Sequence, residues 1–273
     1  MVTLHLCLLV LAGLWGSLAS KDHNGQTVDP EHHDLSQKAL LFPKDANTEY
    51  VIVEPNTTGN LDSYTVCMRA HSDLNRPYAL FSYGTRDGSP DIVLLRKTPG
   101  KYSILMRDSR FEFDVWGKGC PCHSMDHVCL SWEKKTGVVE FWWNGQPSPR
   151  QGALKKASLR PNSKLILGQQ QGSSRDNFVD EVAFKGEIED VKMWDRVLTA
   201  KEVCNVWRRK PVPGSTVTWE RLSYTVHGDV TVAPSLSQAC VPSWSCHFGS
   251  QCPGAPCVCQ DVPGSQYPDE AFP

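Results

Sequence analysis

Short apolar runs separated by turn residues recur along most of this chain from Ala39 onward. The runs at 50–53, 63–68, 92–95 and 102–106 are rich in β-branched and aromatic residues, which predicts strands. Many short strands between Gly, Pro and Asn turns are typical of an all-β domain. We therefore predict a two-sheet antiparallel sandwich of the jelly-roll kind.

The clearest hairpin is predicted between Val128 and Trp143. One strand ends at Trp132, residues 133–137 form the turn, and the chain returns from Val138. Asn144-Gly145 then predicts a further turn, because both residues tolerate positive φ. Along the returning strand, Phe141-Trp142-Trp143 alternates with the pleat, so at least one ring is expected in the core.

One segment has helical rather than strand periodicity. Residues 199–207 begin with Thr199, a good N-cap residue, and place Val203, Val206 and Trp207 at helical spacing. The basic residues 208–210 that follow suit the negative end of a helix dipole. We predict one short helix here.

The two ends of the chain differ from the strand-rich middle. An apolar run from Leu4 to Leu14, with small residues near position 20, predicts a signal peptide at 1–20 and a secreted protein. Residues 21–35 read as a polar leader. No later stretch has the ~18 apolar residues of a membrane span. Residues 235–273 hold five cysteines and form a predicted Cys-rich tail, too small to build a core without disulfides.

Ten cysteines remain once Cys7 leaves with the signal peptide, an even number that suggests pairing in an oxidising compartment. They are Cys67, Cys120, Cys122, Cys129, Cys204, Cys240, Cys246, Cys252, Cys257 and Cys259. Cys120-Pro121-Cys122-His123, with His127 and Cys129 nearby, also has the ligand types of a zinc cluster. Extra disulfides are the preferred interpretation. A bond between Cys120 and Cys122 would be strained, so Cys204, the tail or another subunit is the expected partner.

The formal net charge is −2, with acidic and basic residues mixed, which gives no basic footprint for nucleic acid. The sequon Asn56-Thr57-Thr58 lies in a turn-like setting and predicts an N-glycan at Asn56.

Several blocks in order give the chain a family resemblance. The segment from His127 to Trp132 reads His-x-Cys-x-Ser-Trp, and it is accompanied by the blocks 81–83, 137–142, 167–169, 186–188 and 193–195. Together they resemble the pentraxin family, with a domain at 36–234. The resemblance implies a jelly roll with one helix, and a disulfide between Cys67 and Cys129 across the sandwich.

The resemblance also implies two calcium ions per subunit, but the ligand positions differ here. The family's Asp-Asn pair falls on Ser89 and Pro90, its Glu-Gln-Asp run on Gln170, Gln171 and Gly172, and its later Glu and Gln on Val179 and Val182. Only Gln171 is kept, and no matched carboxylate remains. Because calcium affinity falls as carboxylates are removed, weak or absent binding is expected. The acidic neighbours are Asp87, Asp91, Asp176, Asp180 and Glu181, and a one-residue slip could bring Asp91, or Asp180 and Glu181, to the ion as substitutes.

Two other site interpretations are weaker. The choline pocket of the family aligns with Leu95 and Arg110, and Arg110 would repel a quaternary ammonium. Glu187 and Glu189 lie on one strand face as in jelly-roll glycosidases, but the third expected acid is Met193. We therefore predict a binding protein and not an enzyme.

Two functions remain open. The first is a pattern-recognition protein of innate immunity, a cyclic homo-oligomer of five subunits binding arrayed glycans, phosphate-bearing groups or debris and presenting them to complement or phagocyte receptors. The second is a disulfide-linked structural component of an extracellular matrix, coat or secretion. The vacated ligand positions and the Cys-rich tail favour the second, and the family resemblance favours the first.

Overall fold

The computed structural model describes residues 32–57, 59–85, 89–115, 125–152, 155, 159–160, 163–172, 178–237, 246–247 and 258–259. The predicted signal peptide and residues 21–31 lie outside this set, as do Cys120, Cys122 and most of the tail. Among the described residues, no helix is long and apolar enough to cross a membrane.

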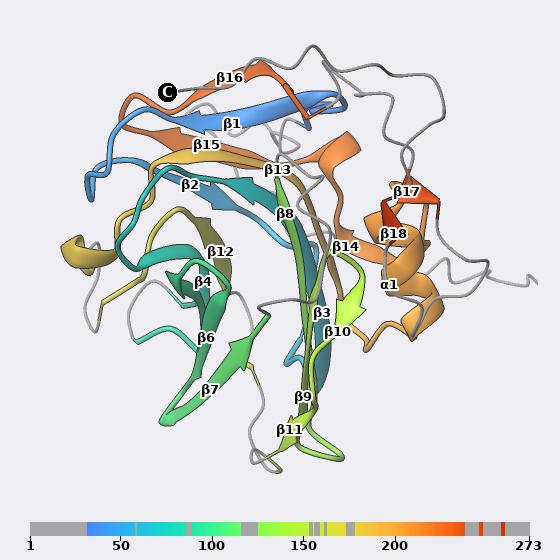
Figure 1. The fold of residues 1–273 in the computed structure, drawn as a ribbon. Helices are drawn as coiled ribbons and strands as arrows, with labels where there is room; N and C mark the ends of the chain where they lie inside the picture. Colours follow the sequence, from blue (N-terminus) through green and yellow to red (C-terminus); the bar gives the residue numbers. More distant parts are fainter. Residues whose placement is uncertain are drawn as a thin grey trace, which may run out of the picture. The chain divides into compact units, whose positions relative to one another are not determined.

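One layer of the fold is a nine-stranded antiparallel sheet (Figure 1). Its main path is β10 (Gln146–Pro147), β9 (Val138–Trp143), β8 (Asp126–Glu133), β3 (Ser63–His71), β13 (Gly186–Trp194), β1 (Lys38–Phe42) and β16 (Thr231–Pro234). Two short strands pair off this path, β11 (Gln151–Gly152) on β9 and β14 (Ser215–Val217) on β13.

The second layer is a seven-stranded antiparallel sheet. Its order is β15 (Tyr224–His227), β2 (Tyr50–Val53), β12 (Lys164–Leu167), β4 (Tyr78–Gly84), β5 (Ile92–Thr98), β6 (Lys101–Met106) and β7 (Ser109–Asp114). The remaining elements are α1 (Ala200–Trp207), the single-turn helices η1 (Asp180–Val182) and η2 (Trp219–Arg221), and the pair β17 (Cys246–His247) and β18 (Val258–Cys259). The predicted sandwich with one helix is confirmed.

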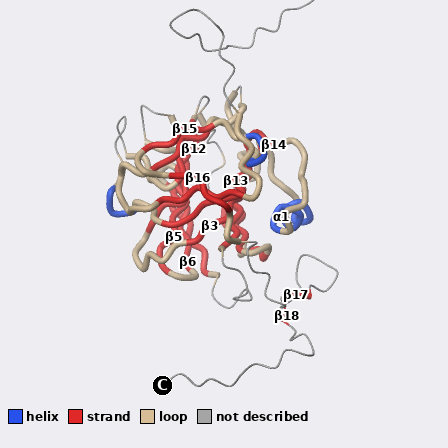
Figure 2. Tube along the Cα trace, turned by 90° about the horizontal axis from the view of Figure 1, so that it is seen from above, coloured by secondary structure: helices blue, strands red, loops and turns tan. Residues whose placement is uncertain are grey.

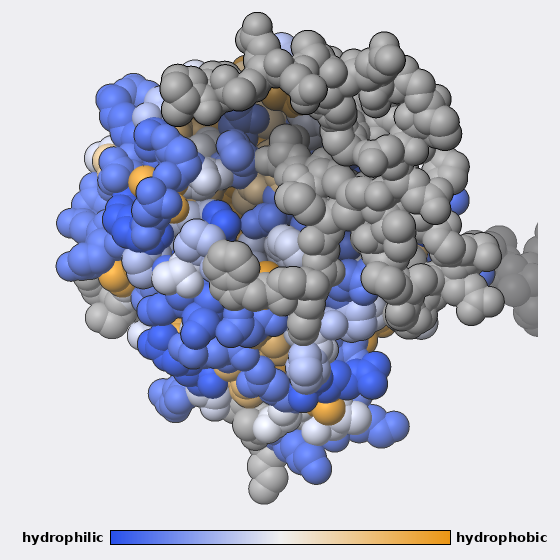
Figure 3. Space-filling model, viewed as in Figure 1, coloured by the Kyte–Doolittle hydropathy of each residue, from blue (hydrophilic) through white to orange (hydrophobic). Residues whose placement is uncertain are grey.

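The main core lies between the two sheets and follows from the alternation along each strand. In β7, Phe111 and Phe113 are buried while their neighbours are half-buried or exposed. In β9, Phe141 is fully buried in this core, and burying such a side chain contributes about 3 kcal/mol. Hydrophilic residues predominate on the visible described surface, with isolated apolar positions (Figure 3).

The outer face of the nine-stranded sheet is covered by α1, which lies to one side of the strands in both views (Figures 1 and 2). Val203 and Val206 of the helix pack onto Trp142 and Trp194 of the sheet. This second apolar layer explains why β3 and β8 are buried almost throughout rather than alternately. Trp142 thus faces the helix, while its neighbour Phe141 faces the main core.

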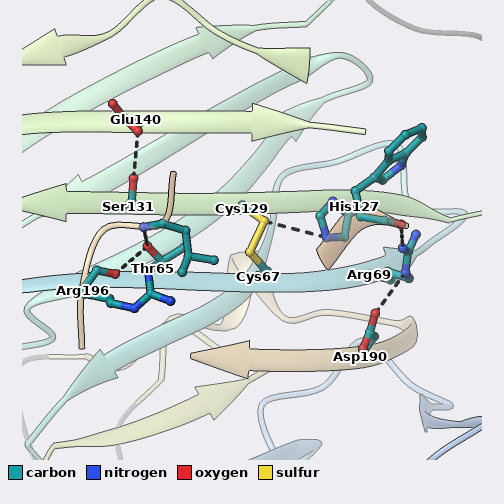
Figure 4. Close-up of a disulfide and its surroundings, with 11 residues drawn as sticks. Thr65, Cys67, Arg69, His127, Cys129, Ser131, Glu140, Asp190 and Arg196 are labelled. Atoms are coloured by element: carbon teal, nitrogen blue, oxygen red, sulfur yellow. Dashed lines mark hydrogen bonds and ion pairs between the residues drawn. A yellow bond between two sulfur atoms is a disulfide. The ribbon is translucent and has the colours of Figure 1, made fainter. Parts of the chain in front are cut away.

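The predicted disulfide between Cys67 and Cys129 is present (Figure 4). It does not cross the sandwich, however. The two cysteines are directly opposite each other on neighbouring strands β3 and β8 of one sheet, and they belong to the layer under α1. The expectation of a bridge between sheets was wrong, because the register of this strand pair already brings the two residues together.

A buried ion pair fixes the C-terminal end of α1 to the sheet. The Arg69 guanidinium donates to the Trp207 carbonyl at the end of the helix and to Asp190, with Nε 3.3 Å from Oδ2 (Figure 4). Asp190 adopts a φ of 54° within an irregularity between β13 and β3, which turns its carboxylate toward Arg69. Burial lowers the pKa of Arg69, but a guanidinium keeps its charge at neutral pH.

The predicted hairpin and helix match the observed elements. Val128 pairs with Trp143, and Asn144 and Gly145 have φ values of 47° and 76° in the following turn. Thr199 caps α1 in a full capping box with Glu202. The end of the predicted polar leader is structured, because His33 forms a β-bridge with Leu222 and the Leu35 amide donates to the Trp219 carbonyl.

We predict that replacing Arg69 by Gln lowers the free energy of unfolding by about 2–4 kcal/mol, since it leaves a buried carboxylate and a helix carbonyl with fewer partners. Urea denaturation of the variant measures this. Arg221→Gln, at an exposed position, is the control and should change stability by no more than about 0.5 kcal/mol. Equal effects of the two changes would contradict the anchoring role.

The capping box also predicts a pH dependence. A bidentate pair with Arg196, aided by Thr199, lowers the pKa of Glu202 to about 2. Because the folded pKa is depressed, the stabilisation by this carboxylate is present above its unfolded pKa of ~4.3 and is lost as pH falls toward 2. The stability difference between wild type and Glu202→Gln should therefore shrink over that window in urea titrations. Thr199→Ser keeps the capping hydroxyl, so its free energy of unfolding should differ little from that of wild type at any pH.

Candidate functional site

The positions that align with the family's calcium ligands lie close together near the end of β4, a central strand of the seven-stranded sheet. A Cβ on Gly84, at the end of β4, would lie 2.8 Å from the Pro90 Cα and 3.2 Å from the Gln171 Oε1. The Val179 amide donates to the Gln170 carbonyl at 3.1 Å. The loop before β5 and the segment after β12 therefore meet where the alignment places them.

The matched side chains offer few oxygens to a cation. Gln171 is buried, and its side-chain Oε1 is without a hydrogen-bond partner among the described residues. Gln170 is half-buried, as are Gly172, Val179 and Val182. Two neutral amide oxygens and the Ser89 hydroxyl, in a setting of glycine, proline and valine, fall short of the six to eight oxygens with carboxylates that calcium requires.

Two of the acidic neighbours, Asp180 and Asp91, have side-chain partners of their own. Asp180, which is exposed, accepts a hydrogen bond from Asn47 at 2.7 Å. Glu181 is also exposed, and its backbone carbonyl accepts from Arg76. Asp91 is buried and paired with two arginines, Arg107 and Arg160. Asp87 and Asp176 lie outside the described residues. The described residues therefore do not fit a two-ion calcium site.

Leu95, the position aligned with the apolar wall of the family's choline pocket, is buried by its neighbours. Leu95 forms a small cluster with Ala79 and Val93 on the outer face of the sheet, and Val182 packs against it. A position aligned with a calcium ligand thus supplies an apolar contact instead. Arg110 is exposed, as the sequence suggested, and faces away from the main core on alternating strand β7.

The residues considered for a zinc cluster fall into two groups: Cys129 in a disulfide with His127 nearby, and three residues outside the described set. Cys129 is bonded to Cys67, so it is not a thiolate, and the His127 Nε2 lies 3.8 Å from its sulfur (Figure 4). Cys120, Cys122 and His123 lie outside the described residues. Cys204, buried in α1, is also disulfide-bonded. Its partner is neither Cys67 nor Cys129, since those two are bonded to each other.

The two carboxylates considered for glycoside chemistry have structural partners. Glu189 is buried and accepts hydrogen bonds from Arg209 and from Ser237, which follows β16. Glu187 is half-buried at the register position opposite His71, and Met193 is fully buried. Glu189 therefore fastens the segment after β16 to the sheet.

Several charged residues at this site were not singled out by sequence reasoning. Arg160 and Arg107 lie 69 and 16 positions from Asp91, and no local motif links them. The same is true of Arg69 and Trp207, which are 138 positions apart. Such pairs arise from the sheet topology alone.

Comparisons with known proteins agree with this architecture. The Pentaxin family model matches residues 38–234. Serum amyloid P-component of Homo sapiens is 33% identical over 203 residues, covering 74% of this chain and 90% of that protein. C-reactive protein of Sus scrofa is 34% identical over 236 residues, covering 86% of this chain and 99% of that protein.

A solved structure is similar in fold. The native heptameric SAP-like pentraxin from Limulus polyphemus superposes with a TM-score of 0.63 at 20% identity, covering 75% of this chain and 98% of that one. Sequence match and fold thus point to one family. Since the family model spans nearly the whole of the described sandwich, this chain belongs to the pentraxin family.

Proposed function

We propose that this protein is a secreted pattern-recognition pentraxin of innate immunity that binds arrayed extracellular ligands through a ring of identical subunits. The observation that carries the proposal is the pentraxin sandwich itself, matched along residues 38–234. The ligand classes are glycans, phosphate-bearing groups and debris. Complement or phagocyte receptors are the proposed recipients of the bound ligands.

A ring makes weak sites effective. Once one subunit holds an arrayed ligand, the other subunits bind at a high effective concentration, and avidity exceeds single-site affinity by about 10²–10⁴-fold. Cyclic symmetry is common among homo-oligomers, and the similar Limulus protein is heptameric. We propose a cyclic homo-oligomer of about five subunits here.

Secretion is supported by the disulfides and by the N-terminal apolar run. The bonds at Cys67–Cys129 and at Cys204 are of a kind that persists in oxidising compartments. Asn56 is exposed, which suits the proposed N-glycan on a secreted chain. Calcium is proposed to bind weakly or not at all, because the matched positions lack carboxylates.

The alternative is a disulfide-linked structural component of an extracellular matrix, coat or secretion. One observation favours it. Cys204 is bonded to a cysteine other than the family pair, and five cysteines follow in the tail. Disulfides beyond the domain's own bridge are suited to joining subunits or rings. Under this proposal the ring would assemble into larger reducible species.

A single set of measurements separates the two proposals. We predict that the purified mature protein sediments as a ring of about five subunits and is retained on phosphoethanolamine or glycan surfaces about 10²-fold more strongly at high ligand density than at low density. Free monovalent phosphoethanolamine is the control competitor and should release it poorly. The measurements are analytical ultracentrifugation and surface binding with and without chelator.

A monomer that binds dense and sparse surfaces equally would contradict the ring proposal. If the protein stays insoluble until it is reduced and forms high-order species on a non-reducing gel, the structural role would be supported in place of recognition.

A further inference from the structure

The geometry points to Arg160, assisted by Arg107, as a built-in cation that cross-links the loops of the aligned calcium face through the Asp91 carboxylate. In this assignment the guanidinium groups do the structural work that a bound divalent cation would otherwise do. The inference concerns how this face is held together, and it stands whichever ligand or ring the protein forms.

The first step is the contact geometry around Asp91. Its side chain is 3% exposed, so the charge is almost removed from water. The Arg160 Nε lies 3.2 Å from both carboxylate oxygens, and the Arg160 amide donates to Oδ2 at 2.9 Å. The Arg107 Nη2 lies 3.4 Å from Oδ1. Both oxygens of the buried carboxylate are therefore engaged by cations.

The second step is what these contacts join. The Arg160 guanidinium also donates to the Ser89 carbonyl, and the Asp91 carbonyl accepts from the Arg107 amide at 3.1 Å. The Asp91 amide donates to the Tyr83 carbonyl at the end of β4. Positions 89–91 and 107, at the open end of the β5–β6 hairpin, and the remote position 160 are thus tied to one carboxylate.

The third step is why arginine serves this role. A guanidinium is always charged, is planar and offers several fixed donors, so it holds a carboxylate and a carbonyl at once. The side chains of Arg160 and Arg107 are 36% and 40% exposed, which leaves them partly hydrated and lessens their desolvation cost. Unlike an ion, they cannot be removed by a chelator.

The same arrangement opposes calcium. Asp91 is the buried acid nearest to the aligned ligand loop among the residues described, and its two oxygens already face two positive charges. A divalent cation would have to displace a guanidinium and would meet repulsion from it. The uncharged Gln171 and the apolar Val179 and Val182 offer no compensating carboxylate.

The test compares two aspartates, each in an ion pair. Asp91→Asn removes the buried charge. Asp73→Asn removes an exposed charge, because the Asp73 side chain, which pairs with Lys185, is 70% exposed. We expect Asp91→Asn to lower Tm by about 5–10 °C and Asp73→Asn by about 1 °C or less. Wild-type Tm should be the same, within about 1 °C, in millimolar calcium and in EDTA.

A second comparison keeps the test decisive if Asp91→Asn fails to fold. Arg160→Gln should raise amide hydrogen exchange in segments 89–92 and 107–109 by at least about tenfold, while exchange in β3 and β8 stays unchanged. Arg160→Lys keeps the charge but loses the planar guanidinium with its several donors. Its exchange rates in these segments should lie between those of wild type and Arg160→Gln.

Three outcomes would overturn the inference. One is a rise of several degrees in wild-type Tm on adding calcium, with saturable heat in a calorimetric titration. Another is an Arg160→Gln variant whose exchange in these segments equals that of wild type. The third is additive Tm shifts in the Asp91→Asn/Arg160→Gln double variant, because residues that act on each other must show a smaller combined effect.

Discussion

A carboxylate withdrawn from water needs hydrogen-bond donors or a positive partner beside it, and at three positions of this domain that partner is an arginine. Asp91, Glu189 and Asp190 are all buried. Each of the three forms an ion pair with arginine: Asp91 with Arg160 and Arg107, Glu189 with Arg209, and Asp190 with Arg69. Each pair joins elements that are distant in sequence, so the charges act as cross-links between loops, helix and sheet.

The Asp190 cross-link shows how one charge organises several layers. Asp190, with a φ of 54°, lies where the regular pairing of β13 with β3 is interrupted. Its carboxylate is turned toward Arg69 and accepts a hydrogen bond from it. Arg69 then reaches the last carbonyl of α1. The helix in turn covers the Cys67–Cys129 bridge and Trp142, so the apolar outer layer depends on a polar anchor at its edge.

Local patterns were sufficient for the secondary structure and insufficient for the site. Alternation and turn residues predicted the β8–β9 hairpin, although not its register, and Thr199 predicted the start of α1. The cysteine pair was recognised by resemblance, but its location within one sheet follows from the register of β3 with β8, which no local pattern encodes. The partners of Asp91 were missed for the same reason: Arg160 is 69 residues away and is brought close only by the folded sandwich.

The chemistry left on the aligned ligand face limits what it can recognise. Val182 packs on the apolar cluster of Val93 and Leu95, so a position aligned with a calcium ligand makes an apolar contact instead. At the matched positions no carboxylate is present to hold a metal ion shared between protein and ligand. Under the proposed function, recognition at this face uses direct hydrogen-bond donors and apolar contact, which are weak singly. Under that proposal, binding of this kind becomes useful only when many copies act together, so subunit assembly matters more where the matched positions lack carboxylates.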